Sequence, residues 1–148
     1  MSTIYFKHLN ESAVTPTRAH SSDAGFDIYA SERIFIPIGA TVKIPTGIAA
    51  AVPEGTYVQI ADRSSMAVKG LRTGAGVIDS SYRGEWIIVM HNLNHDSHTF
   101  VGERGYMIQK GDKIAQAIHV PILLSEAVIT ETLPKTVRGH NGFGSTGS

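Results

Sequence analysis

The sequence contains no cysteine, and this absence excludes several kinds of structure and site. Without thiols the chain cannot use a disulfide framework, a thiol nucleophile, or a zinc or iron–sulfur centre held by thiolates. A cysteine-free composition favours an intracellular protein, located in the cytoplasm or, in a eukaryotic or viral host setting, the nucleus. With 148 residues the chain is still long enough to bury a core as a single domain, 1–148, without such staples.

The chain also lacks net charge and long hydrophobic runs. Its 13 Lys and Arg balance 13 Asp and Glu, so no broad field favours nucleic acid or an anionic membrane as a partner. The longest uninterrupted apolar runs, 48–52 and 86–90, are far shorter than the roughly 20 residues of a membrane span. Residues 1–14 show no signal peptide. We therefore expect no nucleic-acid partner and no membrane, although a local anion pocket stays open.

What the sequence does contain is a series of short apolar segments separated by Gly and Pro turns. Apolar residues alternate with others over 34–38 and again over 42–44, which predicts extended strands. The continuous run 86–90 is typical of a strand buried on both faces. Only the stretch from Ser65 to Lys69 suggests a helix, with a serine as its cap. The pattern predicts an all-β sandwich or barrel with at most one short helix.

The last ten residues, 139–148, differ from the rest because they hold four glycines and one large apolar side chain, Phe143. Such a segment buries too little surface to offset its ordering entropy, so we expect a flexible Gly-rich tail. Its 142–147 stretch matches G-x-G-x-x-G, but no strand and helix flank it as a dinucleotide fold requires. The residues that remain suited to an anion are Gly144, Ser145, Thr146 and Arg138. A frayed tail is the alternative.

Three histidines, His91, His95 and His98, lie close together with Asp96 among them. Zinc binding would require the first pair on one helical face, whereas the intervening residues are typical of a loop after a strand. We therefore expect a surface loop that carries histidines.

Two further segments combine residue types that suit a nucleotide. Over 74–84, small residues beside a β-prone pair allow close backbone approach to a flat ligand, and Asp79 could act as a general base. A plain hairpin turn explains the same residues. Over 63–65, an Arg beside a helix start suits phosphate, and a simple N-cap with a solvated Arg is the alternative.

Taken together and in order, five segments resemble the motifs of the trimeric dUTPase family. They cover nearly the whole chain: 23–30 (DAGFDIYA), 63–70 (RSSMAVKG), 74–84 (GAGVIDSSYRG), 111–116 (GDKIAQ) and 138–147 (RGHNGFGSTG). The resemblance implies a distorted, jelly-roll-like β-sandwich subunit, with a core over 1–137 and a mobile arm over 138–148. It also implies a homotrimer with active sites at subunit interfaces, and Mg²⁺-dependent hydrolysis of dUTP to dUMP and pyrophosphate.

The same resemblance assigns roles to particular residues. Asp79 would activate the attacking water, and Tyr82 would pack on the deoxyribose. Uracil would enter the hairpin formed by Gly74, Ala75, Gly76, Val77 and Ile78, with Phe143 stacked on it. The phosphate-binding residues would be Arg63, Ser64, Ser65, Gln116, Arg138, Gly144, Ser145 and Thr146. No direct protein ligand to the metal is expected, and Asp27 is a candidate structural or outer-shell carboxylate.

The sequence departs from the family pattern at four positions. Asp62 stands where Pro is usual, Ser65 where Gly is usual, Met66 where Leu is usual, and Asn141 where Gly is usual. The first of these places a carboxylate beside the expected phosphate site. Two other functions remain as alternatives. A dCTP deaminase of the same fold would need a Glu in the strand after the hairpin, where this chain has Val89 and no carboxylate over 86–92. A non-catalytic relative would lack Asp79, Tyr82 or Phe143, and all three are present.

Overall fold

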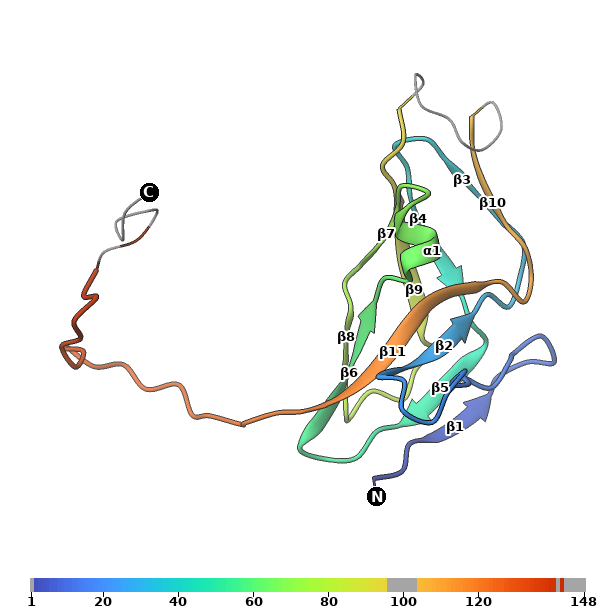
Figure 1. Cartoon of the computed structure of the whole chain (residues 1–148). Coiled ribbons are helices and arrows are strands. Elements are labelled where there is room, and N and C mark those ends of the chain that lie inside the picture. Colours follow the sequence, from blue (N-terminus) through green and yellow to red (C-terminus); the bar gives the residue numbers. More distant parts are fainter. Residues whose placement is uncertain (1, 96–103, 141, 143–148) are drawn as a thin grey trace.

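The computed structural model describes residues 2–95, 104–140 and 142, and it shows an all-β body from which the C-terminal part of the chain extends (Figure 1). The elements are β1 (Tyr5–His8), β2 (Gly25–Tyr29), β3 (Ile34–Pro37), β4 (Thr41–Pro45), β5 (Ile48–Ala51), β6 (Thr56–Ala61), α1 (Ser64–Ala67), β7 (Leu71–Gly74), β8 (Val77–Asp79), β9 (Ile87–Asn92), β10 (Gly105–Ile108) and β11 (Lys113–Pro121). The predicted all-β class with one short helix is confirmed.

Four antiparallel sheets make up the body. A four-stranded sheet has the order β2-β11-β6-β8, and a three-stranded sheet has the order β4-β9-β7. Two-stranded sheets β1-β5 and β10-β3 complete it. Neighbours in each sheet are far apart in sequence, as in the pair of Thr41 with His91. The body therefore depends on long-range pairing, which is typical of sandwich folds.

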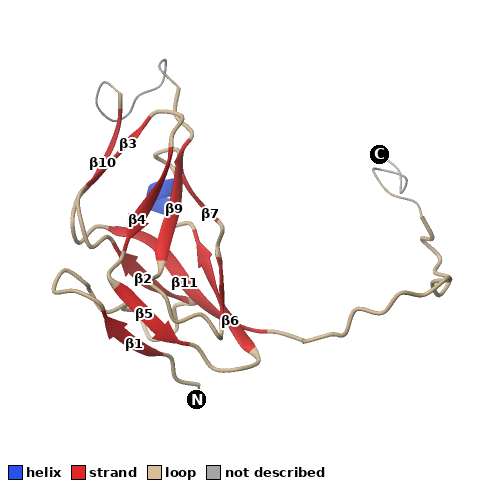
Figure 2. Cartoon of the chain, turned by 180° about the vertical axis from the view of Figure 1, so that it is seen from behind, coloured by secondary structure: helices blue, strands red, loops and turns tan. Residues whose placement is uncertain are grey.

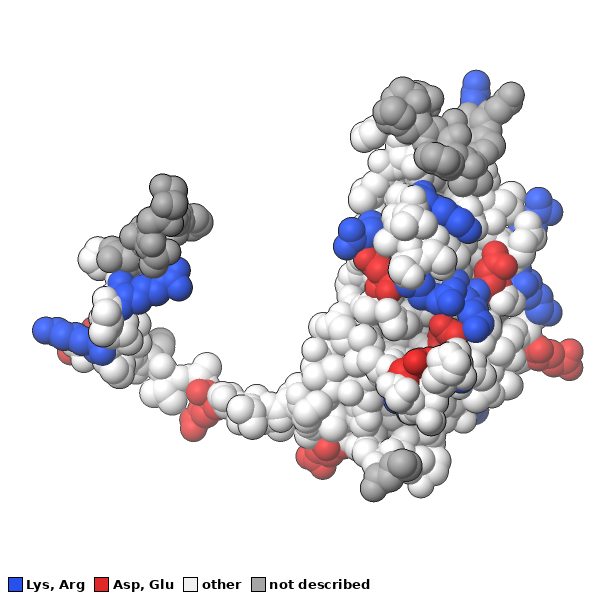
Figure 3. Space-filling view, viewed as in Figure 1, with Lys and Arg blue, Asp and Glu red and all other residues white. Residues whose placement is uncertain are grey.

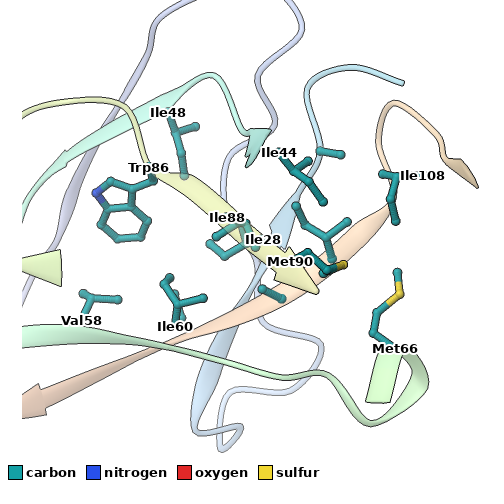
Figure 4. Packing of buried hydrophobic residues seen from close by; sticks show 14 of the residues in the cluster. Ile28, Ile44, Ile48, Val58, Ile60, Met66, Trp86, Ile88, Met90 and Ile108 are labelled. Atoms are coloured by element: carbon teal, nitrogen blue, oxygen red, sulfur yellow. The ribbon is translucent and has the colours of Figure 1, made fainter. Parts of the chain in front are cut away.

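The core lies between the two larger sheets. Figure 4 shows Ile88 and Met90 of β9 facing Val58 and Ile60 of β6, with Ile28 of β2 between them. Ile28 and Met90 are fully buried, and Ile88 and Val58 are almost fully buried. Each such side chain contributes about 1.5–3 kcal/mol when it leaves water, so this layer stabilises the frame that carries the site.

Trp86 closes the same core at the start of β9. Its indole ring is buried and meets Phe6 edge to face, with ring centroids 5.4 Å apart. Its backbone N–H donates to the carbonyl of Ile48 at 2.8 Å, and its carbonyl accepts the Thr46 hydroxyl at 2.5 Å. The segment before β9 is thereby fixed to β5 and to the turn that precedes it.

Two sequence expectations differ from the structure. Strand β9 is not buried on both faces, because burial alternates along it and Ile87 is 38% exposed. It is the central strand of an antiparallel sheet, and within one chain only one face of that sheet is covered. Helix α1 is not capped by a serine. Arg63 occupies the N-cap position in an extended conformation and makes no side-chain cap bond.

The C-terminal arm extends directly from the end of β11 in the described structure. Strand pairing ends at Pro121, and residues 122–140 are exposed and form no strand. Figures 1 and 2 show this segment running away from the body as an extended chain. Strand pairing within the described chain thus ends before the expected core boundary at 137, and that boundary stays a prediction. Residues 122–137 contain apolar side chains, as a core segment would, and they are exposed among the described residues.

None of the described residues forms a helix long and apolar enough to span a membrane.

Candidate active site

The segment that joins β7 to β8, called the hairpin below after the sequence expectation, forms one wall of a cavity of about 210 Å³, the nucleoside pocket. The two strands do not pair with each other, because β7 pairs with β9 and β8 pairs with β6. Seven of the eight residues expected around the base, the sugar and the water line this single cavity, and the eighth, Phe143, lies outside the described residues. The seven are Gly74, Ala75, Gly76, Val77, Ile78, Asp79 and Tyr82. The structure thus brings the residues of the third motif together.

The backbone of this hairpin is held tightly against β6. Gly76 accepts hydrogen bonds from the Ile60 N–H at 2.6 Å and from Gln59 Nε2 at 3.1 Å. A Cβ at Gly76 would lie 2.5 Å from Gln59 Nε2 and from the Ile60 carbonyl, so no larger residue fits without movement. Ala75 adopts a left-handed backbone with φ of 56°. This conformation is uncommon for a residue with a side chain and is typical of functional turns.

Asp79 and Tyr82 follow the hairpin on the open side of the nucleoside pocket. Asp79 ends β8 and is exposed, and its carbonyl accepts the Tyr82 N–H at 3.1 Å across a turn. The Tyr82 ring is 47% exposed, and its hydroxyl donates to the Glu85 carbonyl at 3.1 Å. A carboxylate at the rim and a fixed aromatic ring are therefore available to a ligand in this pocket.

A second cavity, of about 340 Å³, is the phosphate pocket. Its lining combines Ala19 with residues from the first, second and fourth motifs: Asp23, Ala24, Gly25, Asp27, Arg63, Ser64, Lys113 and Gln116. Figure 3 shows Lys and Arg side chains interleaved with Asp and Glu on the face that carries α1. Three of the predicted phosphate-binding residues, Arg63, Ser64 and Gln116, are thus brought together.

Asp27 lies between two cations of the phosphate pocket. Its carboxylate is 3.1 Å from Arg63 Nε and 2.7 Å from Lys113 Nζ. Arg63 Nη1 also donates to the Lys113 carbonyl at 3.2 Å. The hydrogen bond and the charge of Asp27 raise the pKa of Lys113, so its ammonium stays protonated at neutral pH. In this structure Asp27 therefore acts as a structural carboxylate that orients the two cations.

The donor set of the two pockets suits Mg²⁺ bound mainly through substrate. Among the described residues, no group of three or more His, Asp or Glu side chains could hold a metal ion. Asp23 and Asp27 line the phosphate pocket, and Asp79 lines the nucleoside pocket. Protein Mg²⁺ sites commonly use one or two carboxylates together with substrate phosphates, and these residues fit that arrangement.

Not every expected residue lies in a pocket. Ser65 is exposed on α1 and lines neither cavity. Arg138 is exposed on the extended arm and also lines neither one. Phe143, Gly144, Ser145 and Thr146 lie outside the described residues, as does Asn141.

Sequence reasoning did not single out several residues that line the pockets. Glu85 and Trp86 line the nucleoside pocket, and Glu85 Oε1 accepts the Gly47 N–H at 2.7 Å. Lys113 also lines the phosphate pocket. Regular alternation of side chains along β11 would place Lys113 and Gln116 on opposite faces of the sheet. A break in register between Lys113 and Ala115 brings both side chains to one side. The sequence signal was the lysine inside the fourth motif, but the bulge that directs it is a tertiary feature.

The described histidines of the cluster line neither pocket, although the His91 ring lies against Gly74, where a Cβ would be 2.5 Å from its Nε2. His91 belongs to β9 rather than to a loop, and its Nδ1 is 2.7 Å from the Thr41 hydroxyl of the neighbouring strand. His91 and His95 line another cavity, of about 520 Å³, together with Asn92 and Asn94. His98 lies outside the described residues.

A pocket lined by small and apolar residues and a second pocket that holds cations supply the two parts that a nucleotide-binding protein needs. A family model described as dUTPase matches residues 11–147. The chain therefore belongs to the dUTPase family.

Individual relatives are similar to this chain along nearly its whole length. The chain is 43% identical to a deoxyuridine 5'-triphosphate nucleotidohydrolase of Paramecium bursaria Chlorella virus 1, and the match covers 99% of each chain. It is 43% identical to the enzyme of that name from Saccharomyces cerevisiae, over 93% of this chain and 89% of the yeast protein. Among solved structures, the dUTPase of Staphylococcus bacteriophage 80alpha with dUPNHPP superposes with a TM-score of 0.89, at 31% identity and full coverage of both chains.

Proposed function

We propose that this chain hydrolyses dUTP to dUMP and pyrophosphate, and so keeps uracil out of DNA and supplies dUMP for dTMP synthesis. The observation that carries the proposal is that the nucleoside pocket gathers the hairpin, Asp79 and Tyr82 around one cavity. The names of the relatives in Chlorella virus 1 and yeast support the substrate.

The nucleoside pocket suits uracil with a deoxyribose. Because Gly76 is pressed against Gln59 and Ile60, the hairpin backbone is fixed, and its N–H and carbonyl groups can read the edge of a base. A methyl group at C5 would meet this same backbone, which disfavours thymine. The Tyr82 ring would pack on the sugar face and leave no room for a 2′-hydroxyl.

Asp79 is the proposed general base. Its carboxylate would take a proton from a water molecule while the water oxygen bonds to the α-phosphorus. The bond from the α-phosphorus to the bridging oxygen breaks, and that oxygen leaves with the β- and γ-phosphates as pyrophosphate. Mg²⁺, when bound with the triphosphate, supplies further charge neutralisation. The acceptor carboxylate then returns its proton to solvent.

The phosphate pocket would align the triphosphate. Arg63 and Lys113 carry fixed positive charge there, and Ser64 and Gln116 add hydrogen-bonding groups. Phosphoryl transfer depends chiefly on positioning and on neutralising charge, which these side chains provide. Ser65 would contribute from α1 if the helix approaches a bound nucleotide.

The arm supports a homotrimeric arrangement in which one chain completes another's site. Its apolar side chains are strongly exposed: Leu123 96%, Leu124 79%, Val128 75%, Ile129 100% and Leu133 81%. So much apolar surface on an extended segment is typical of a contact with a second copy. Arg138, Phe143, Gly144, Ser145 and Thr146 would then close over a nucleotide bound at the interface. Sedimentation of the purified protein should give a trimer, and a monomer would contradict this part of the proposal.

A substrate panel tests the function. With Mg²⁺, the protein should release pyrophosphate from dUTP at least about 100-fold faster than from dTTP, dCTP or UTP, since a fixed polar site rejects unmatched groups strongly. Equal turnover of dUTP and dTTP would refute the assignment. Release of ammonia from dCTP would indicate a deaminase instead.

A further inference from the structure

Glu85 lies at the end of the loop that follows β8, and its side chain reaches a turn from a distant part of the chain. Its Oε1 accepts the Gly47 N–H at 2.7 Å, across 38 residues of sequence. Gly47 is buried, so water is a poor alternative partner for this N–H. Because a buried backbone N–H without an acceptor destabilises the folded chain, the bond from Glu85 fills a requirement of the turn.

The turn around Gly47 is a firm attachment point. Thr46 and Ile48, on either side of it, are each 1% exposed. The Gly47 carbonyl accepts the Leu9 N–H at 2.7 Å. The turn is therefore part of the packed body, and Glu85 attaches the loop to it.

The same residue holds the ring of Tyr82. The Tyr82 hydroxyl donates to the Glu85 carbonyl at 3.1 Å, and the Tyr82 N–H donates to the Asp79 carbonyl at 3.1 Å. A Cβ at Gly84 would overlap the Tyr82 ring, so the ring lies directly over this glycine. These contacts fix the shape of the loop, but all of them lie within it or at its start.

The place of the loop depends on the Glu85 carboxylate. Among the residues that the structure describes, this carboxylate makes the one hydrogen bond that joins residues 80–85 to another part of the chain. The next connection is the Trp86 N–H, which donates to the Ile48 carbonyl. Without Glu85, the loop would keep its internal bonds but lose its attachment beside the Tyr82 ring.

We propose that Glu85 is a positioning residue that sets which sugar the nucleoside pocket accepts. This inference rests on the proposed hydrolysis of dUTP, in which the Tyr82 ring packs on the deoxyribose. Glu85 touches no reacting atom and acts through Tyr82, because a loop attached to Gly47 holds the ring at one distance from the sugar. A ring that is free to shift leaves space for a 2′-hydroxyl.

The part of the nucleoside pocket expected to receive the base is held by other contacts. The Gly76 carbonyl accepts bonds from the Ile60 N–H and from Gln59 Nε2, and neither bond involves Glu85. Loss of Glu85 should therefore weaken selection against a 2′-hydroxyl and leave selection against a C5 methyl group unchanged. This split separates positioning of the ring from a general loosening of the pocket.

Four variants test the hydrogen bond. Glu85→Ala removes the acceptor, Glu85→Gln keeps an acceptor oxygen at the same reach without the charge, and Glu85→Asp keeps the charge on a side chain one methylene shorter. Glu32→Ala, which removes an exposed carboxylate that lines neither pocket, is the matched control. For each variant, kcat and KM are measured with dUTP, UTP and dTTP. Glu85→Asp carries the test if Glu85→Ala does not fold.

We expect Glu85→Ala to reduce the ratio of kcat/KM for dUTP to that for UTP by about 10- to 50-fold, since the fit of one small group in a pocket is worth about that factor. The corresponding ratio for dUTP against dTTP, and kcat for dUTP, should change less than about fivefold, because the hairpin and Asp79 are untouched. Glu85→Asp should show the same loss of sugar selection. Glu85→Gln and Glu32→Ala should stay within about threefold of the unchanged protein.

A double substitution tests whether the effect passes through Tyr82. Tyr82→Ala alone should lose sugar selection. Adding Glu85→Ala should then change the ratio for dUTP against UTP by less than about twofold, because the ring that Glu85 positions is gone. A further loss as large as that caused by Glu85→Ala alone would overturn the proposed role.

Two measurements need no turnover. In the unliganded protein, Glu85→Ala should speed backbone hydrogen exchange at Gly47 and Tyr82. In calorimetry, the preference for dUMP over UMP should fall by about tenfold in the same variant. If the unchanged protein hydrolyses no dUTP but prefers dUMP to UMP, the proposed function fails, and loss of that preference in Glu85→Ala still supports this inference.

Several results would overturn the positioning role. They are unaltered exchange at Gly47, an unaltered selection between the two sugars, and equal losses of sugar and base selection in Glu85→Ala. A Glu85→Gln variant as impaired as Glu85→Ala would also do so, because the amide oxygen can accept the same hydrogen bond. A protein that does not distinguish dUMP from UMP and does not hydrolyse dUTP would refute this inference together with the proposed function.

Discussion

The nucleoside pocket and the phosphate pocket differ in the kinds of groups that line them. The first combines the small residues that join β7 to β8 with apolar and aromatic side chains, and its shape depends on Gly76 having no side chain and on Ala75 adopting a left-handed conformation. The second is bounded by charged side chains, and its shape depends on Asp27 holding Arg63 and Lys113. One pocket can therefore select by steric fit and the other by charge.

This difference predicts how each pocket responds to change. A pocket whose shape depends on the absence of a side chain at Gly76 is sensitive to added volume there and less sensitive to salt. A pocket lined by ion pairs tolerates small changes in volume but depends on ionic strength, because exposed charges are screened. Asp79 stands at the rim of the first pocket.

The largest effect should come from Asp79, the one group proposed to take part in proton transfer. Asp79→Asn should lower kcat by about 10²- to 10⁴-fold, because an amide cannot accept the proton of the attacking water. Calorimetry with dUpNHpp should show binding within a few fold of the unchanged protein. Full activity in this variant would remove Asp79 from the mechanism.

The next largest effect should come from adding one methyl group to the nucleoside pocket. In Gly76→Ala the new Cβ would meet Gln59 and the Ile60 carbonyl at 2.5 Å, so the hairpin must shift. Overpacking of this kind costs about 1–3 kcal/mol, and we expect KM for dUTP to rise about 10- to 100-fold. Gly55→Ala, at a turn with open space around it but a positive φ, controls for backbone strain alone. Equal effects of the two substitutions would show that the close approach is unimportant.

A smaller effect should follow the loss of one charge from the phosphate pocket. Lys113→Gln should weaken binding of dUpNHpp by about tenfold, and binding of dUMP by less, because the effect scales with the charge of the ligand. Binding titrations at low and high salt should show that the difference in dUpNHpp affinity between Lys113→Gln and the unchanged protein narrows as the salt concentration rises. A difference that persists unchanged at high salt would argue against an electrostatic role.

The smallest effect concerns stability and Asp62. Partial burial alone would raise the pKa of Asp62, but the backbone and hydroxyl hydrogen bonds of Thr73, with Arg72, lower it below its ordinary value of 3.8. A carboxylate with a lowered pKa stabilises the fold above pH 3.8, and this contribution is lost as the pH falls through the lowered value.

Asp62→Asn should therefore reduce the free energy of unfolding by about 1 kcal/mol at neutral pH. The difference in the free energy of unfolding between Asp62→Asn and the unchanged protein should shrink below about pH 4. Urea titrations over pH 3–7 measure this difference. If the difference in the free energy of unfolding does not depend on pH, the charge on Asp62 does not contribute to stability.

Several features of the fold and site were predictable from local sequence. Alternating apolar residues predicted the strands around Ile36 and Ile44, which are both fully buried. Small residues before Val77, Ile78 and Asp79 predicted a close backbone approach, which is observed at Gly76, but the expected β-hairpin is not formed because β7 and β8 pair with strands of different sheets. The short helix was also found, although its cap was assigned to a serine rather than to Arg63.

Other features were not predictable, because they depend on contacts between distant segments. The sequence placed the Asp62 carboxylate beside the phosphates, but the edge of β7 lies ten residues further along the chain and draws it away. Lys113 joins Gln116 on one side of β11 only because the strand changes register between them. The apolar residues over 122–137 likewise do not reveal in sequence that they are exposed in the described structure, because burial depends on contacts with other segments.

By itself, the sequence determined the chemical groups that this protein has available: small residues that allow close backbone approach, an acidic residue at 79, and cations at 63 and 113, without thiols or a net charge. Residue type fixes these, because charge, pKa and side-chain volume are properties of each residue. Only the tertiary structure decided that they form two pockets of different construction, that Asp27 orients the cations, and that Asp62 joins β6 to β7. Those outcomes depend on which strands pair, and pairing is set by burial of the shared core rather than by any single segment.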